Sequence, residues 1–269
     1  MNASLPPLHF SHANSFPAGC YRQVLDDLAK DFDLGYIEAL GHDPAYPVSD
    51  GWPHLVRESI AFIERRYRAP VIAVGHSLGG FLSFMCAIER PDLFRAVVLL
   101  DSPVFSRRVS TMLWLAKRLG FIERLTPGRG TRQRRQIWPD TEAVVRHFRG
   151  RGMFANFDPD CLRDFAEGGT VAFDGGVRLR FDPEVEYRIY CGLPDHLPRL
   201  RGRLTVPTGF IGGRDSAYVK PADLRHMQRH FGIELAELDG GHLFPMEVPR
   251  QTAMAIRQMI ARLSTGGPK

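Results

Sequence analysis

One ten-residue stretch constrains the fold of this chain more than any other. An apolar, β-branched run at residues 71–74 leads directly into Gly75-His76-Ser77-Leu78-Gly79, and an apolar pattern with helical spacing follows from Phe81 to Ile88. The pattern predicts a strand, a sharp turn and a helix. A turn this tight crowds the residues on both sides of the serine, and glycine relieves the crowding because it has no Cβ. We therefore expect Ser77 to be held out at the end of a sheet.

The Gly-x-Ser-x-Gly pattern is short and also occurs by chance in loops, so the rest of the chain must supply what a reactive serine needs. A serine nucleophile requires a general base, an acid that orients the base, and donors for the oxyanion that forms. Each requirement can be searched for at the ends of the other predicted strands, because open parallel sheets build their sites there.

Two predicted strands end in candidate partners for Ser77. Residues 210–215 end a strand in a Gly-Gly-Arg-Asp loop that carries Asp215, and residues 238–242 end the last strand in a Gly-Gly-His loop that carries His242. His242 would take the proton of Ser77 and later return one to the leaving group, while Asp215 would orient and stabilise the imidazole. The sequence therefore predicts a Ser77, Asp215 and His242 triad.

Other residues compete for these roles. Asp101 also ends a predicted core strand and is the alternative acid. An aspartate at a strand end is often only a turn or helix-capping residue, so the order of the three residues carries more weight than any one of them. His76 lies inside the serine motif, and we expect it to pack rather than to react.

Two backbone N–H groups are the expected oxyanion donors. One belongs to Leu78, directly after the serine. The other belongs to the loop after the first strand, Ser11-His12-Ala13-Asn14-Ser15, where Asn14 is at the donor position and Ser15 is the alternative. The Asn14 side chain either reaches the pocket or caps the loop.

Short apolar runs alternate with helical patterns along most of the chain. This alternation predicts an α/β fold with a mostly parallel sheet of about six strands and helices on both faces. The expected strands are residues 8–10, 34–39, 71–74, 96–100, 205–211 and 233–238, and the expected helices include 21–30, 52–67, 221–230 and 253–263.

The alternation stops between residues 103 and 198. We expect this segment to be an inserted, mainly helical cap, with helices at 111–119, 141–148 and 159–165, over a core formed by residues 1–102 and 199–269. Aromatic residues of the cap are candidates for a ligand wall. Packing inside the cap is the more common use of such residues, which here are Trp114, Phe121, Trp138, Phe148, Phe154 and Phe157.

The cap is strongly basic. Residues 103–151 hold twelve Lys and Arg against three acids, a net charge of +9 in a chain whose net charge is +5, so the remainder is at −4. Such a surface can face nucleic acid, a membrane or an anionic ligand. No nucleic-acid-binding motif accompanies it. We expect a solvated helical face with no nucleic-acid or membrane partner, whose arginines could attract an anionic group on a small-molecule substrate.

Composition limits the remaining possibilities. The chain has 269 residues, enough for one large domain with an insertion, and no apolar run approaches the length of a membrane span. No basic and apolar leader is visible at the N-terminus, and the four cysteines show no CxxC pairing. We expect a cytoplasmic protein with reduced thiols, no metal site and no cofactor.

The chain resembles the α/β-hydrolase superfamily over nearly its whole length, in particular its capped, single-domain, esterase-like serine hydrolases. Asp215 and three short motifs carry the resemblance: Ser11-His12-Ala13-Asn14, Gly75-His76-Ser77-Leu78-Gly79 and Gly241-His242, with Gly41-His42-Asp43-Pro44 in addition. It implies an α/β-hydrolase fold. Epoxide hydrolases and haloalkane dehalogenases of this superfamily carry an aspartate where Ser77 stands, so Ser77 argues against both chemistries.

The function that these residues predict is hydrolysis of a small to medium carboxylic ester or thioester through an acyl-enzyme on Ser77. The same triad would also serve a C–C bond hydrolase or an acyltransferase, and the same fold also supports ligand sensors. The substrate, its acyl length and the oligomeric state do not follow from the sequence.

Overall fold

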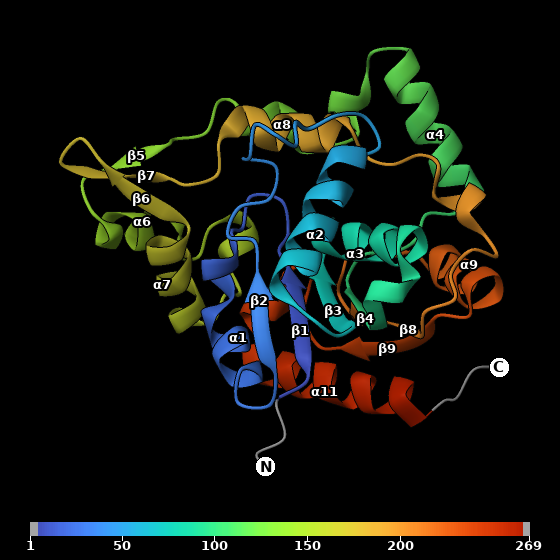
Figure 1. The fold of residues 1–269 in the computed structure, drawn as a ribbon. Coiled ribbons are helices and arrows are strands. Elements are labelled where there is room, and N and C mark those ends of the chain that lie inside the picture. The colour runs from blue at the N-terminus through green and yellow to red at the C-terminus, as the bar shows by residue number, and fades with distance from the viewer. Residues whose placement is uncertain (1–4, 266–269) are drawn as a thin grey trace.

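A single six-stranded sheet forms the centre of the protein in a computed structural model that describes residues 5–265 (Figure 1). The strand order is β2-β1-β3-β4-β8-β9, and every neighbouring pair is parallel. This confirms the predicted α/β-hydrolase sheet of six strands. The strands are β1 (Pro7–Ser11), β2 (Asp33–Tyr36), β3 (Val71–His76), β4 (Phe94–Leu100), β8 (Thr208–Gly213) and β9 (Glu234–Leu238).

Helices cover both faces of this sheet. Successive residues of β3 point to opposite faces, so Ile72 and Val74 join one apolar cluster and Val71 and Ala73 join the other. The first cluster contains side chains of α1 and α11, and the second contains side chains of α2, α3 and α9. These helices are α1 (Arg22–Leu28), α2 (Pro53–Arg66), α3 (Leu78–Glu89), α9 (Pro221–Phe231) and α11 (Pro249–Thr265).

The start of β8 differs from the prediction for a simple reason. The apolar run begins at Thr205, but the strand begins at Thr208, directly after Pro207. Proline has no N–H to donate to a sheet ladder, so only its carbonyl takes part, accepting from the N–H of Val97.

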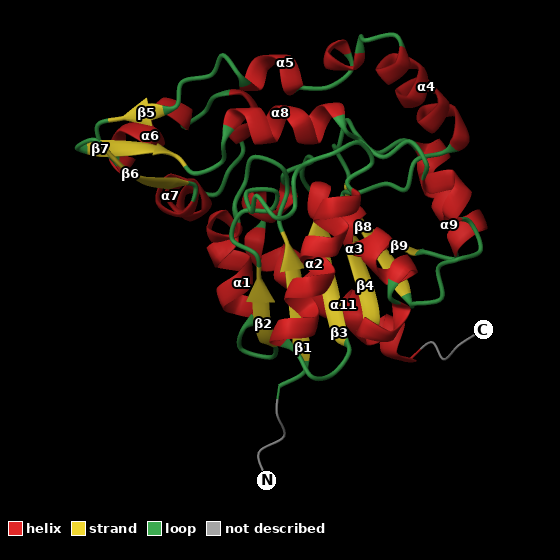
Figure 2. Ribbon diagram, turned by 45° about the horizontal axis from the view of Figure 1, so that its top comes forward, coloured by secondary structure: helices red, strands yellow, loops and turns green. Residues whose placement is uncertain are grey.

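Residues 103–198 form a second layer over the carboxyl ends of the strands (Figures 1 and 2). The three helices that the sequence predicted are present as α4, α6 and α7. The segment also holds a three-stranded antiparallel sheet, β5-β7-β6, and the prediction of a mainly helical cap did not include these strands. Asp174 and Gly175 have φ of 44° and 74°, as the turn of a β-hairpin requires. The elements are α4 (Arg107–Arg118), α5 (Gly128–Thr131), β5 (Ile137–Trp138), α6 (Thr141–Phe148), α7 (Pro159–Gly168), β6 (Thr170–Phe173), β7 (Gly176–Leu179) and α8 (Pro183–Cys191).

The second layer shares an apolar core with the sheet layer. Phe154 and Phe165 pack on Phe16 of the β1–α1 connection, with ring centroids 5.8 and 5.7 Å apart, and all three belong to the cluster that covers one face of the sheet. Trp138 is almost fully buried in the same cluster. The cap aromatics Trp138, Phe154 and Phe157 therefore stabilise the packing of this layer.

The four cysteines are free, and Cys20, Cys86 and Cys161 are buried. Burial raises the pKa of these three thiols, which disfavours their reactive thiolate form. None of the helices between residues 5 and 265 has the length and apolar character needed to span a bilayer.

The turn between β3 and α3 brings three backbone segments into close contact. Ser77 occupies this turn with φ of 51° and ψ of −115°. This backbone conformation is strained for any residue other than glycine. A Cβ on Gly75 would overlap the Gly79 carbonyl, and a Cβ on Gly79 would overlap the backbone carbonyl of Ser11. The Gly79 N–H donates to the His12 carbonyl at 3.1 Å. The glycines are therefore required by space.

We expect Gly79→Ala to lower the free energy of unfolding by at least about 2 kcal/mol, because the backbone of β1 would have to move to make room. Gly130→Ala is the matched control, since a Cβ there meets nothing within 4 Å and Gly130 lies in α5. That control should be neutral or slightly stabilising. Urea unfolding of the three proteins measures both effects, and equal stability of Gly79→Ala and wild type would contradict the packing described here.

Candidate active site

Ser77, His242 and Asp101 form one hydrogen-bonded chain at the carboxyl end of the sheet. The Nε2 atom of His242 lies 3.1 Å from the Oγ atom of Ser77, and its Nδ1 atom lies 2.6 Å from Oδ2 of Asp101. A carboxylate only accepts, so Nδ1–H donates to Asp101, and the free Nε2 of a neutral ring accepts from the Ser77 hydroxyl. This is the arrangement through which an imidazole activates a serine.

Asp101 is held in a buried, fully hydrogen-bonded position. It is 1% exposed and follows β4 directly, with φ of 47°. Its Oδ1 accepts from the Gly213 N–H at 2.8 Å, and its Oδ2 accepts from the Ser216 hydroxyl at 2.6 Å as well as from His242. These donors satisfy a carboxylate that would otherwise be costly to bury.

The structure does not bring Asp215 to His242. Asp215 is exposed in the loop after β8, where its backbone N–H donates to the Gly240 carbonyl at 3.0 Å. The loops that follow the strands explain the difference: Asp101 lies directly after β4 with its carboxylate bonded to Gly213, Ser216 and His242, whereas the loop after β8 leaves the Asp215 side chain exposed. The Asp215 prediction is therefore wrong as to geometry, and the competing candidate Asp101 occupies the place beside His242. The same loop contributes instead the hydroxyl of Ser216 to Asp101.

The two predicted oxyanion donors are the residue after Ser77 and a residue that shares its cavity. Leu78 begins α3, so its N–H has no partner within the helix. Asn14 is 6% exposed and lines the same cavity as Ser77. Among residues 5–265 the backbone N–H of neither residue donates to a protein group. The Ala13 N–H, by contrast, donates to the Tyr21 hydroxyl at 3.1 Å. Leu78 and Asn14 thus remain the donors that this geometry favours.

The side chain of Asn14 connects this loop to the second layer. Its Nδ2 donates to the carbonyl of Glu186 in α8 at 3.1 Å, and within the described part of the chain its Oδ1 is buried without a partner. The Glu186 carboxylate is also buried and pairs with Arg134. Burial raises the pKa of Glu186. Sequence reasoning missed this contact, because 172 residues separate its two ends.

His76 is buried at the back of the site and belongs to a hydrogen-bond network. Its Nε2 lies 2.8 Å from the carbonyl of His242, and its Nδ1 lies 2.7 Å from the hydroxyl of Tyr21. Burial, with a further contribution from His242, lowers the pKa of His76 well below its usual value, so the ring is neutral. Nε2–H therefore donates to His242, and Nδ1 accepts from Tyr21. The network joins the Ala13 N–H to the backbone of His242.

An apolar cavity of about 290 Å³ opens in front of Ser77. Asn14, Asp101 and His242 supply polar groups at one end, and the walls come from both layers. None of the described residues that line the cavity is a lysine or an arginine. The wall residues include Phe81, Phe105, Leu113, Leu125, Met153 and Leu193, and none of the cap aromatics proposed from the sequence is among them.

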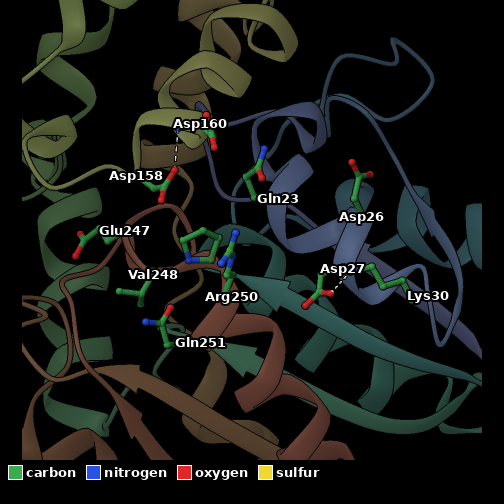
Figure 3. A pocket seen from close by; sticks show the side chains of 11 residues that line it. Gln23, Asp26, Asp27, Lys30, Asp158, Asp160, Glu247, Val248, Arg250 and Gln251 are labelled. Atoms are coloured by element: carbon green, nitrogen blue, oxygen red, sulfur yellow. Dashed lines mark hydrogen bonds and ion pairs between the residues drawn. The ribbon is translucent and has the colours of Figure 1, made fainter.

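A larger hollow of about 860 Å³ lies elsewhere, between α1, the start of α7 and the start of α11 (Figure 3). It is lined mainly by polar and charged side chains, including Asp26, Asp158 and Arg250, and it lacks the Ser77 and His242 pair. Glu247 borders this hollow and accepts from the Gly241 N–H at 2.9 Å, so it supports the loop that carries His242. Within residues 5–265 no group of three or more His, Cys, Asp or Glu is placed to hold a metal ion.

Sheet order, serine turn and histidine loop together define a hydrolase of the α/β type. A family model described as the alpha/beta hydrolase family matches residues 10–255, so the chain belongs to that family. It is 26% identical over 227 residues to 2-(acetamidomethylene)succinate hydrolase of Mesorhizobium japonicum, covering 83% of this chain and 76% of the relative. It is 26% identical over 205 residues to Lipase LipV of Mycobacterium tuberculosis, covering 74% of this chain and 72% of the relative.

Solved structures with the same fold include E-2-(acetamidomethylene)succinate hydrolase, with a TM-score of 0.77, 24% identity and coverage of 96% of this chain and 92% of that one. The thioesterase domain from the curacin biosynthetic pathway has a TM-score of 0.72, 18% identity and coverage of 94% and 91%. At these identities the structural likeness establishes the fold. The two curated relatives and the family support hydrolase activity.

We expect Tyr21→Phe to destabilise the protein by about 1–3 kcal/mol, because it leaves the buried Ala13 N–H and Nδ1 of His76 without partners. Tyr36→Phe is the control: Tyr36 is partly exposed, and its hydroxyl makes no hydrogen bond to any residue in the described range. Thermal and urea unfolding compare the two variants with wild type. A loss in Tyr36→Phe as large as that in Tyr21→Phe would contradict the network.

Proposed function

We propose that this protein is a serine hydrolase that cleaves a carboxylic ester or thioester with a small to medium apolar acyl group. Ser77 is the nucleophile, His242 the general base and acid, and Asp101 the residue that orients His242. The observation that carries the proposal is the continuous hydrogen-bonded chain from Asp101 to Ser77 at the end of an apolar cavity.

The reaction follows from this arrangement. The Ser77 oxygen attacks the acyl carbonyl while its proton passes to Nε2 of His242, and the N–H groups of Leu78 and Asn14 stabilise the oxyanion. Collapse of the tetrahedral intermediate breaks the bond to the leaving alcohol or thiol, which receives the proton from His242. Water, activated by His242 in the same way, then releases the carboxylic acid and restores Ser77.

The cavity favours an uncharged substrate. Its walls are mainly apolar, with phenylalanine, leucine and methionine side chains among them, and its volume of about 290 Å³ is near the small end of the range for ligand pockets. No lysine or arginine is among the described residues that line it, so their side chains offer no permanent positive charge to a carboxylate of the substrate. The anionic substrate that the basic cap had suggested is therefore not the one favoured here.

Substitution of the two competing acids tests the triad. We expect Asp101→Asn to lower kcat for p-nitrophenyl butyrate by about 10²–10⁴-fold, because the imidazole loses the acceptor that fixes its tautomer. Asp215→Asn should stay within about twofold of wild type, since that side chain is exposed and the imidazole of His242 bonds to Asp101 instead. Steady-state hydrolysis at neutral pH measures both.

Ser77→Ala is the reference for complete loss, and urea unfolding checks that each variant is folded. If Asp215→Asn lost activity while Asp101→Asn kept it, the assignment of Asp101 would be wrong. Full activity in Ser77→Ala would exclude the serine mechanism itself.

The substrate of the curated relative provides a second comparison. That relative hydrolyses 2-(acetamidomethylene)succinate, and a succinate carries two carboxylates. We expect kcat/KM for this compound to be at least about 100-fold below that for p-nitrophenyl butyrate, because burial of an unpaired carboxylate costs several kcal/mol. Initial rates over a concentration series measure the ratio. Faster turnover of the dicarboxylate would favour the relative's activity over the ester hydrolase proposed here.

A further inference from the structure

Helix α4 exposes apolar side chains where a helix on a protein surface usually carries polar ones. Its inner face packs through Leu113 and Ala116, but Met112, Leu115 and Leu119 are 49%, 43% and 62% exposed. Their spacing of three and four residues places them along one side of the helix. Leu125, after the following turn, is also exposed. We call these four residues, Met112, Leu115, Leu119 and Leu125, the apolar strip.

The surroundings of the apolar strip are positively charged. Five arginines of the same segment are exposed, and none forms an ion pair with an acid between residues 5 and 265. Glu123 is the only acid from residue 104 to 131, and it accepts a hydrogen bond from the Tyr187 hydroxyl. The segment therefore combines unpaired positive charge with exposed apolar surface. The arginines are Arg107, Arg108, Arg118, Arg124 and Arg129.

The strip is continuous with the mouth of the cavity in front of Ser77. Met112 and Leu125 are both exposed and part of the cavity lining. Met153 and Tyr218 share this property, with 55% and 53% exposure. These shared residues form an apolar path from the apolar strip into the cavity. An apolar molecule bound at the strip can follow this path to Ser77. Helix α4 lies at the outer edge of the second layer, away from the central sheet (Figures 1 and 2).

We infer that the apolar strip and its arginines adsorb onto an anionic lipid surface, from which an apolar ester enters the cavity. Leucine and methionine side chains would enter the boundary between headgroups and acyl chains, while the arginines would contact lipid phosphates and carboxylates. The entry of an ester rests on the proposed function, whereas adsorption itself does not. The basic segment was expected to be a solvated helical face without a membrane partner, and the exposed leucines and methionine beside the arginines are the observation that favours adsorption instead.

Two other occupants fit the surface less well. A symmetric dimer through the strip would place the same arginines of two copies against each other, with no acids to neutralise them. A nucleic acid would pair with the arginines but would leave the leucines and methionine of the strip unburied, because these side chains lack the aromatic rings on which bases stack.

Sedimentation with vesicles tests the inference on the full chain. We expect the protein to bind vesicles of phosphatidylcholine mixed with phosphatidylserine, to bind pure phosphatidylcholine much more weakly, and to be released by salt. The double variant Leu115→Gln, Leu119→Gln should bind at least about tenfold more weakly, since it removes apolar area that the lipid would cover. Met254→Gln, at an equally exposed position on α11, is the matched control and should bind as wild type does.

Hydrolysis of soluble p-nitrophenyl butyrate separates this inference from the proposed function. Leu115 and Leu119 do not line the cavity, so the double variant should keep wild-type rates, and Ser77→Ala should bind vesicles normally. Absence of binding to anionic vesicles, or equal binding by the double variant and wild type, would overturn the inference. So would a dimer or a DNA complex that depends on the strip while the vesicles remain unbound.

Discussion

The close approach of Gly79 to the backbone of β1 is the constraint on which the rest of the site depends. Because Gly79 has no side chain, the start of α3 can lie directly against the end of β1, where a Cβ would overlap the Ser11 carbonyl. The hydrogen bond from the Gly79 N–H to the His12 carbonyl fixes this contact. One backbone contact therefore holds the start of α3, where Leu78 lies, against the loop that carries Asn14.

The histidine side of the site depends on buried polar groups that support one another. Asp101 can remain a buried carboxylate only because Gly213, Ser216 and His242 all donate to it. His76 donates a hydrogen bond to the carbonyl of His242, and Glu247 accepts one from the N–H of Gly241. The imidazole is thus oriented through its ring by Asp101 and through its backbone by its neighbours, and such pre-organisation lowers the cost of reaching a transition state.

The sequence contained enough information to predict the sheet, which the structure confirms, and to name Ser77 and His242 as candidates, which lie within hydrogen-bond distance of each other. The patterns behind these predictions are local: parallel strands are continuous apolar runs, and Ser77 and His242 each follow a predicted strand within a glycine-containing turn. It could not choose between Asp101 and Asp215, because both follow apolar strands and both precede His242 in the chain. The conformation at the end of β8 decides, because it leaves Asp215 exposed and directs the Gly213 N–H and the Ser216 hydroxyl to Asp101. Spacing along the chain does not give this conformation.

The second layer shows two other limits of the sequence. The Asp174-Gly175 pair is a hairpin signal, but the flanking strands β6 and β7 are only four residues long each and were missed. The cavity walls could not be predicted either: Trp138 and Phe154 became core, while Leu125 and Met153 line the cavity. Side chains of similar hydrophobicity serve both purposes, and only the packing of α4 and α8 over the sheet separates them.

A crystal structure of the protein after reaction with an alkyl fluorophosphonate tests the central claim most directly. The account predicts one phosphonyl group on Oγ of Ser77, its oxygen bound by the N–H groups of Leu78 and Asn14, its alkyl chain in the apolar cavity, and the Asp101 carboxylate on Nδ1 of His242. An unmodified Ser77, or a His242 that bonds to Asp215 instead, would contradict it.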